Sequence, residues 1–296
     1  IFSPTRGSYD VSIPSGVLLS APYSGEGFDQ SGGQGLDVVQ GEPAQVRQLA
    51  VGYGTLRAVR AEAPVTAPRI EADLRLDGAR VVGTIRNAST QTLLKPALVL
   101  GTGVLVLDDL AAGATATIDL QASPDEFGRA LSERIFGQQQ WTSDGRPTVD
   151  YLRDQDSRQL TDALTYDPFF GSNGTLPSDG PVLLAWGPPG LLPVEVAGRE
   201  PRTAGETLYY LPLPLTATGK VTFTPDLMRS SLVEVKAKFF SKDPFTVSIG
   251  AGSVTLAYRP IPTSGSLAAT RLALGINLGR PGPLAAGPAP LGPIGC

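Results

Sequence analysis

The stretch RIEADLRLDGARVVGTIRN, residues 69–87, decides the fold class of this chain. Apolar residues occupy every even position from Ile70 to Leu76 and alternate with charged residues, which is the two-residue period of a strand with one buried face. Asp77-Gly78 then supplies a pair that tolerates positive φ in a two-residue turn, and residues 81–85 run back. The stretch therefore predicts a β-hairpin with one dry face and one charged face.

Composition narrows the class of protein. With 296 residues and 41% apolar content, the chain can bury substantial cores in one large or two modest domains. Only 18% of the residues are charged and the net charge is −4, which argues against nucleic acid as a partner. The longest apolar runs, such as PALVLGTGVLVL at 96–107, are short and broken by Gly or Thr, so we expect no membrane span within these residues.

Several residue types are scarce. The chain has no His, which removes the usual general base and the commonest metal ligand, and Cys296 is its only cysteine. A disulfide framework, a thiolate zinc cluster and a Cys/His nucleophile pair are thereby excluded within this chain, and we expect no cofactor. The first residue is Ile1, so we expect that an upstream piece is missing or was removed. Only five of the 24 basic residues are lysine, a balance that resembles a thermophile or high-GC composition.

The order of strand patterns predicts a mainly β protein with immunoglobulin-like or β-sandwich modules and a small helical insert. The expected regions are an N-terminal β region at 1–66, a small immunoglobulin-like module at 67–122, the helical insert at 123–166, a C-terminal β-sandwich region at 167–278 and a Pro/Gly-rich tail at 279–296. We expect that regions 1–66 and 167–278 complete one discontinuous sandwich, since 66 residues alone make a thin core.

Two helices are expected in the insert. The first, SPDEFGRALSERIFG, has Ser123 as N-cap with Pro124 and Glu126 behind it, places Phe127, Leu131 and Ile135 on one side, and can end at Gly137. The second, over 148–167, places Leu152, Leu160, Ala163 and Leu164 near one face. Farther on, LVEVKAKFF at 232–240 predicts a half-exposed strand with Val233, Val235 and Ala237 on one face and Glu234, Lys236 and Lys238 on the other.

Each candidate chemical site has a plainer interpretation. Asp150, Asp154, Asp156 and Asp162 could suggest Ca²⁺, but a loop of the EF-hand type that begins at Asp150 would have Gln155 where Gly is required, and a solvated helix face with an Asp154/Arg158 pair is favoured. No S-x-x-K, G-x-S-x-G or phosphate-binding loop occurs. Paired carboxylates of the glycosidase kind need no local motif, and the available ones are Asp125, Glu126, Glu133, Glu195 and Glu206.

Aromatic residues provide the better binding hypothesis. Flat apolar faces with polar tips suit both sugars and protein partners. Trp186, however, lies in the apolar run VLLAW, which indicates a core position. Tyr209 and Tyr210 are adjacent and must point to opposite faces of their strand, so at least one of them is expected in the core. The candidate ligand or partner contacts are Trp141, Trp186, Tyr209, Tyr210 and Tyr258.

Four segments carry a resemblance to a known group of proteins: FSPTRGSYDVSIP at 2–14, GTIRNASTQTLLKPALVL at 83–100, LDDLAAGATATIDL at 107–120 and PVLLAWGPPGLLPVEVAGREPRTAGETLYYLPLPL at 181–215. In their order the chain resembles the extracytoplasmic β region of predicted bacterial membrane-anchored proteins of unknown function. The resemblance implies location and architecture and carries no reaction to any residue.

Together these observations predict a non-catalytic extracytoplasmic protein with a structural or protein-interaction role in the bacterial cell envelope. Its expected partners are other envelope proteins or copies of itself, with contact to the membrane only through segments outside these residues. A carbohydrate-binding module, with polysaccharide as ligand, is the alternative, and a glycosidase with paired carboxylates is the third.

Overall fold

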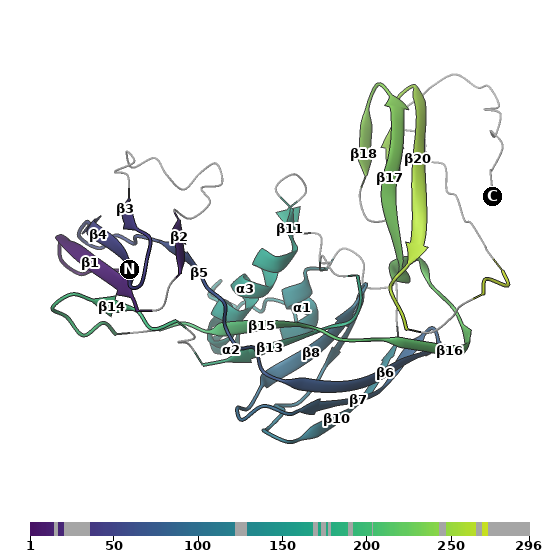
Figure 1. Ribbon diagram of the computed structural model, residues 1–296, viewed down its shortest axis with the longest axis horizontal. Helices are drawn as coiled ribbons and strands as arrows, with labels where there is room; N and C mark the ends of the chain where they lie inside the picture. Colours follow the sequence, from purple (N-terminus) through teal and green to yellow (C-terminus); the bar gives the residue numbers. More distant parts are fainter. Residues whose placement is uncertain are drawn as a thin grey trace. The chain divides into compact units, whose positions relative to one another are not determined.

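The computed structural model describes residues 1–14, 17–20, 36–121, 129–167, 171–172, 176, 179–188, 192–202, 204–242, 247–264 and 268–271. The chain divides into two compact units, residues 1–265 and 266–296, and every helix and strand described lies in the first. The protein is mainly β with a small helical content, so the expected β-sandwich class is confirmed (Figure 1).

The central part of the fold is a sandwich of two four-stranded sheets. The first sheet has the order β10-β7-β6-β16 and the second the order β15-β13-β8-β9. Their facing sides share one hydrophobic core, in which Leu74, Ile85, Leu98 and Leu183 are almost fully buried. The strands are β6 (Ile70–Gly78), β7 (Arg80–Asn87), β8 (Leu94–Leu100), β9 (Gly103–Val106), β10 (Thr115–Gln121), β13 (Val182–Gly187), β15 (Thr207–Pro212) and β16 (Thr216–Val221).

The hairpin expected at 69–87 is formed by β6 and β7, with a turn one residue later than expected. Asp77 pairs with Arg80, so the two turn residues are Gly78 and Ala79, and only Gly78 has positive φ, at 61°. A glycine at the first turn position supplies the one left-handed conformation that such a turn requires. Farther along, Gly83 lies so close to β6 that an added Cβ would be 1.9 Å from the carbonyl oxygen of Asp73. The two backbones can approach only because position 83 has no side chain.

Strand pairing runs across the boundaries expected at residues 122 and 166. β8 lies in the segment expected as a separate small module, yet it pairs with β13 from the later region, with Leu98 opposite Leu183. β16 joins the first sheet by pairing in parallel with β6. The strands of 67–121 and of 182–221 therefore share one core. β13 is buried along its whole length because it faces this core on one side and the helices on the other.

The helices are α1 (Leu131–Phe136), α2 (Val149–Arg153) and α3 (Gln155–Thr165). Leu131 and Ile135 of α1 pack on the β8–β13 side of the second sheet, and α1 ends at Gly137, with φ 82°, as expected. The expected N-cap and the residues behind it, Ser123, Pro124, Asp125, Glu126 and Phe127, lie outside the described residues. None of the helices described is both long and apolar enough to cross a membrane.

The buried side of α3 differs from the expected one. The single helix expected over 148–167 is divided into α2 and α3. Leu152 of α2 and Leu160 of α3 are exposed and Leu164 is only partly buried, whereas the residues of α3 that are buried are Ser157, Arg158, Thr161 and Thr165. Nor does Arg158 form the expected surface pair with Asp154, because Asp154 binds Lys95 at 2.8 Å and the Arg158 guanidinium bonds to the end of α1. A periodic apolar pattern could not reveal this face, since polar groups make its contacts.

An N-terminal sheet with the order β14-β1-β4-β3 has a core of its own, which includes Tyr9, Val11 and Val46. β14 comes from the later half of the chain, and Val196 lies opposite Val11. Region 1–66 thus shares a sheet with a two-residue strand of region 167–278, while β13, β15 and β16 belong to the sandwich. The strands are β1 (Gly7–Ile13), β3 (Asp37–Val39), β4 (Ala44–Val51) and β14 (Glu195–Val196), with β2 (Leu18–Ser20) and β5 (Arg60–Glu62) as a separate pair.

The rest of the described fold is a long hairpin. β17 (Met228–Ala237) pairs with β20 (Gly252–Pro260), and β18 (Phe240–Lys242) pairs with β19 (Val247–Ile249) in the segment between them in sequence. A short 3₁₀ turn, Pro225–Leu227, precedes β17. The remaining pair is β11 (Tyr166–Asp167) with β12 (Gly171–Ser172).

Candidate interaction surface

The β17–β20 hairpin has two chemically different faces. Residues opposite each other in an antiparallel pair point to the same face, so Val235 with Val254 and Leu232 with Leu256 define an apolar face. The other face is polar, with Glu234 opposite Thr255. The apolar face also carries Met228, Ser230, Ala237, Gly252, Tyr258 and Pro260, and the polar face also carries Arg229, Ser231, Lys236, Ser253, Ala257 and Arg259.

Both faces are open to solvent in the part of the chain that the structure describes. Side chains on the apolar face retain large exposed fractions: 49% for Leu232, 38% for Val235 and 57% for Tyr258. The expectation that residues 232–240 form a half-exposed strand is therefore wrong, because every residue from Ser231 to Lys236 is exposed. The alternation correctly placed Val235 and Glu234 on opposite faces, but Leu232, and not Val233, lies opposite Leu256 on the apolar face. Among the described residues no second layer buries that face.

A β-bulge interrupts the alternation near the middle of β17. Leu232 lies opposite Leu256 and Glu234 opposite Thr255, so Val233 is an extra residue in β17. Val233 is 63% exposed. Bulges twist a strand locally and limit the length over which its edge stays regular. The adjacent apolar residues in LVEV were the sequence signal for this bulge.

The root of the hairpin is fixed to the sandwich. Leu227 and Ile261, just outside the two strands, are almost fully buried in the sandwich core, and the amide of Ile261 donates to the carbonyl oxygen of Leu227 at 2.9 Å. Ser264 then continues alongside β16, since the amide of Ala217 donates to the carbonyl oxygen of Ser264 at 3.2 Å. At the root of the hairpin, both the segment that enters it and the segment that leaves it are therefore held by buried residues and backbone hydrogen bonds.

A like-charged pair at the root is neutralised. Arg229 and Arg259 lie opposite each other, an arrangement that is unfavourable by itself. Asp179 lies 3.8 Å from Arg229 and 3.2 Å from Arg259. Because the Asp179 and Arg259 side chains are more than half exposed, this contact adds little stability, but it supplies the opposite charge.

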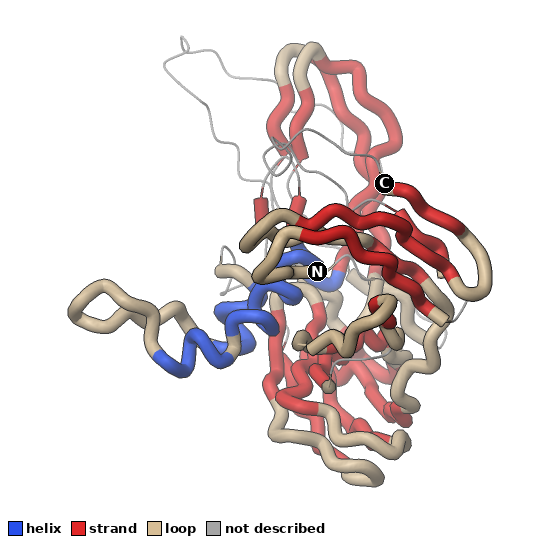
Figure 2. The backbone as a smooth tube through the Cα atoms, turned by 90° about the vertical axis from the view of Figure 1, so that its left-hand side faces the viewer, coloured by secondary structure: helices blue, strands red, loops and turns tan. Residues whose placement is uncertain are grey.

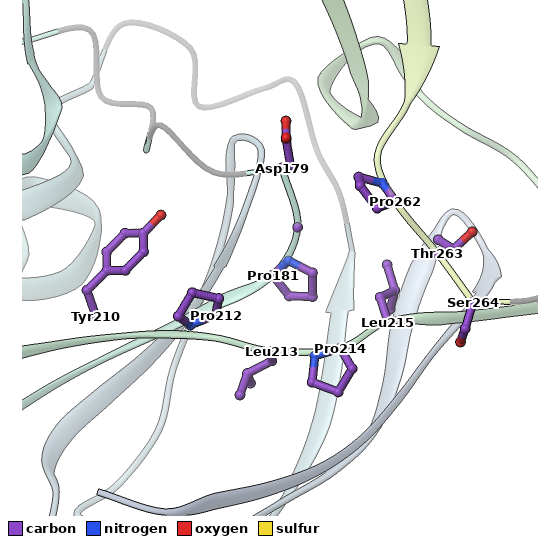
Figure 3. A pocket seen from close by; sticks show the side chains of 11 residues that line it. Asp179, Pro181, Tyr210, Pro212, Leu213, Pro214, Leu215, Pro262, Thr263 and Ser264 are labelled. Carbon is purple, nitrogen blue, oxygen red and sulfur yellow. The ribbon is translucent and has the colours of Figure 1, made fainter. Parts of the chain in front are cut away.

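An apolar pocket of about 510 Å³ lies beside this root (Figure 3). Pro181, Pro212, Pro214 and Pro262 line it, with Leu213 and Leu215 between the strand ends. Asp179 is the single carboxylate in this lining, and Tyr210 contributes its ring. The pocket offers apolar contact area with few polar groups, which suits an apolar side chain better than a charged substrate.

The structure separates the five aromatic residues expected as ligand contacts. Trp186 and Tyr209 are buried, 3% and 6% exposed, on opposite sides of the second sheet. Tyr210 packs on the helix side of that sheet, so Tyr209 and Tyr210 point to opposite faces as expected. Tyr258 is exposed on β20, and Trp141 is exposed in the loop between α1 and α2, which extends away from the strands in Figure 2.

The candidate carboxylates also lie apart. Glu133 is on α1, Glu195 is on β14 and accepts from Ser12 at 3.5 Å, and Glu206 precedes β15 and accepts from the hydroxyl of Ser157. Asp125 and Glu126 are outside the described residues. Across the described ranges, no three acidic or cysteine side chains group in a way that could hold a metal ion.

A comparison with protein families gives a match whose limits are close to those of the sandwich. Residues 69–216 match a family described as Domain of unknown function (DUF8725), and this segment is half of the chain. The chain belongs to the DUF8725 family. The DUF8725 segment begins beside the first residue of β6 and ends at the first residue of β16, so it takes in the helices and seven of the eight sandwich strands in full. Neither the curated proteins nor the solved structures compared with the chain give a match.

Proposed function

We propose that this DUF8725 protein is a non-catalytic extracytoplasmic protein with a structural or protein-interaction role in the bacterial cell envelope, anchored through segments outside these residues. The β17–β20 hairpin is its contact surface. The observation that carries the proposal is the exposed apolar face formed by Leu232, Val235 and Tyr258. Monomeric soluble proteins rarely expose a contiguous apolar patch larger than roughly a few hundred Å², and patches above that size mark interaction sites.

The root of the hairpin supports the same role. A binding element gains affinity when it is held in place before the partner arrives. Leu227 and Ile261 anchor the hairpin in the sandwich core, and the proline-lined pocket beside it offers room for an apolar side chain of a partner. The sandwich then acts as the rigid base and the hairpin as the contact element.

Carbohydrate binding is the less favoured role. A stacking platform needs several exposed aromatic rings on one face. Of the five candidates, only Trp141 and Tyr258 are more than half exposed, and they lie on the α1–α2 loop and on β20. The buried rings, Trp186 and Tyr209, belong to packed cores.

A photo-crosslinking experiment tests the contact surface. A benzophenone amino acid replaces Val233 or Tyr258 in the full-length protein expressed in its own cells, and the matched control carries it at Thr84, an exposed position on β7. We expect adducts of defined size from the two hairpin positions and none from the control. Equal labelling at all three positions, or no adduct at any, would contradict the role.

Fractionation tests the location. Immunoblots of membrane and culture-medium fractions should show a membrane-retained band that is larger than the 30.8 kDa of this chain. A band near that mass in the medium would count against an anchored envelope protein and would move carbohydrate binding forward.

A further inference from the structure

Over residues 233–237, the outer edge of β17 offers a site for strand pairing. β17 and β20 form a two-stranded sheet, and no other strand of the described residues pairs with β17. A two-stranded hairpin is marginally stable in water, and a long edge strand presents unpaired N–H and C=O groups that can pair with another chain. The residues of this part of the strand, from Ser231 to Lys236, are all exposed.

The sequence of this edge is complementary to itself. The segment after the bulge reads Val233, Glu234, Val235, Lys236, Ala237. When two copies run antiparallel with Val235 opposite Val235, Glu234 of each copy lies opposite Lys236 of the other, and Val233 lies opposite Ala237. Opposite charges across a strand pair stabilise it, and like charges destabilise it. The same charges already attract within one strand, where Lys236 Nζ is 2.7 Å from Glu234 Oε1.

Other antiparallel registers of the two β17 strands are less favourable. A register centred on Glu234 or on Lys236 places two like charges opposite each other. A shift of one residue places apolar side chains of one copy beside charged side chains of the other, because opposite residues share a face. The edge of β20 has no such complementarity, since its segment Ser253–Arg259 carries a single charge, Arg259.

We propose that β17 pairs edge to edge with β17 of a second copy of this chain, antiparallel, with the two-fold axis at Val235. This inference rests on the proposed role of the hairpin as the contact surface and names the partner. The result is a four-stranded sheet with the order β20-β17-β17-β20 and one continuous apolar face. The contact closes on itself, as a two-fold contact does, and the bulge at Val233 ends the regular pairing.

Charge exchange tests the register. Sedimentation equilibrium of the full chain should give a reversible dimer. The contact contains two 234–236 pairs. E234K turns both into lysine–lysine pairs and K236E turns both into glutamate–glutamate pairs, so each variant alone should dimerise at least about tenfold more weakly. A mixture of E234K with K236E should restore a dimer, because each pair then joins opposite charges. K220E, a reversal at an exposed position on β16, is the matched control and should leave the dimer unchanged.

A disulfide tests the position of the two-fold axis. In a C296S background, V235C should form a covalent dimer under mild oxidation, since directly opposite residues have Cβ atoms about 4.5–5.5 Å apart. V254C, on the same face of β20, should remain monomeric under the same conditions.

The outcomes separate this inference from the proposed function. A monomer at every concentration, or a dimer that ignores the charge exchange, overturns the β17 pairing. If photo-adducts still form at Val233 or Tyr258 and contain a different protein, the interaction role stands, but the partner is that protein and not a second copy of this chain. If the adducts contain two copies of this chain and the charge exchange behaves as described, both proposals hold.

Discussion

The guanidinium Nη1 of Arg158 donates a hydrogen bond to the backbone carbonyl oxygen of Gly137 at 2.8 Å, across 21 residues of sequence. Its Nη2 donates to the carbonyl oxygen of Phe136 at 2.7 Å. Arg158 is only 7% exposed, and its cation lies 5.4 Å from the ring centre of Phe136 and 5.0 Å from that of Tyr151. A cation at this point satisfies the last carbonyls of α1 and complements the negative end of the helix. Arg158 therefore joins α3 to α1.

Replacing Arg158 with Met should lower the free energy of unfolding by about 3 kcal/mol. Two carbonyl oxygens in part-buried hydrogen bonds lose charged donors, each such bond being worth about 1.5–3 kcal/mol. Urea denaturation followed by circular dichroism measures the change. The control is R153M, because Arg153 lies on the surface of α2 in an exposed pair with Asp150, and its loss should cost less than about 0.5 kcal/mol. Equal effects of the two substitutions would contradict the capping role.

Asn87 should prove to be among the most sensitive polar residues of the sandwich. It is fully buried, its Nδ2 donates to the carbonyl oxygens of Gln91 and Leu110 at 2.8 and 2.9 Å, and its Oδ1 accepts from the amide and hydroxyl of Ser89. N87L should destabilise by about 2–4 kcal/mol, because several buried groups lose their partners together. Thermal denaturation measures the change. T90A, at an exposed position in the same turn, is the control and should leave the stability close to that of the unmodified protein.

Gly83 and Gly78 should respond differently to alanine. At Gly83, with φ 146°, the new Cβ would meet the carbonyl oxygen of Asp73 at 1.9 Å, so β6 and β7 must separate. At Gly78, with φ 61°, no atom lies within 4 Å, and only the backbone conformation is strained. We expect a cost of about 1 kcal/mol for G78A and more than about 3 kcal/mol for G83A. Similar midpoints of denaturation for the two variants would argue against the close approach.

The two tryptophans should report different environments. Trp186 is 3% exposed and packs edge to face with Phe136 at 5.0 Å, whereas Trp141 is 57% exposed. W141F should leave a blue-shifted emission that acrylamide quenches weakly, and W186F should leave a red-shifted emission that it quenches strongly. W186F should destabilise the protein through the cavity that the smaller ring leaves, and no hydrogen bond of the indole Nε1 among the described residues is lost with it. Strong quenching of W141F would contradict the packing of Trp186.

Sequence patterns predicted the parts of this fold that depend on alternation. The β6–β7 hairpin and the opposite directions of Tyr209 and Tyr210 follow from a two-residue period, and the burial of Trp186 follows from its place in an apolar run. The pairing of β8 with β13 could not be predicted, since both are continuous apolar runs without a register signal. The burial of Arg158 was also missed, because its partners are backbone carbonyls that no side-chain pattern encodes.

The sequence predicted one part of the candidate contact surface and not the other. The alternation in LVEVKAKFF identified two faces of β17, and Tyr258 was singled out on β20. What the pattern could not say is whether another layer covers the apolar face, because a strand that faces a core and a strand that faces a partner carry the same period. The exposure of Leu232 and Val235 supplies that missing information.

Because β14 pairs with β1, the N-terminal sheet needs a strand from the later half of the chain and cannot form completely without it. β14 lies inside the segment shared with the DUF8725 family, yet the sheet it belongs to is formed by residues outside that segment. An expression fragment cut at residues 69 and 216 would carry a strand without a sheet, and its Leu192 and Val196 would lose the apolar surface on which they pack. A recombination event that exchanged residues 1–62 would have to preserve complementarity to Glu195 and Val196, so evolution can replace the N-terminal sheet only together with the loop that completes it.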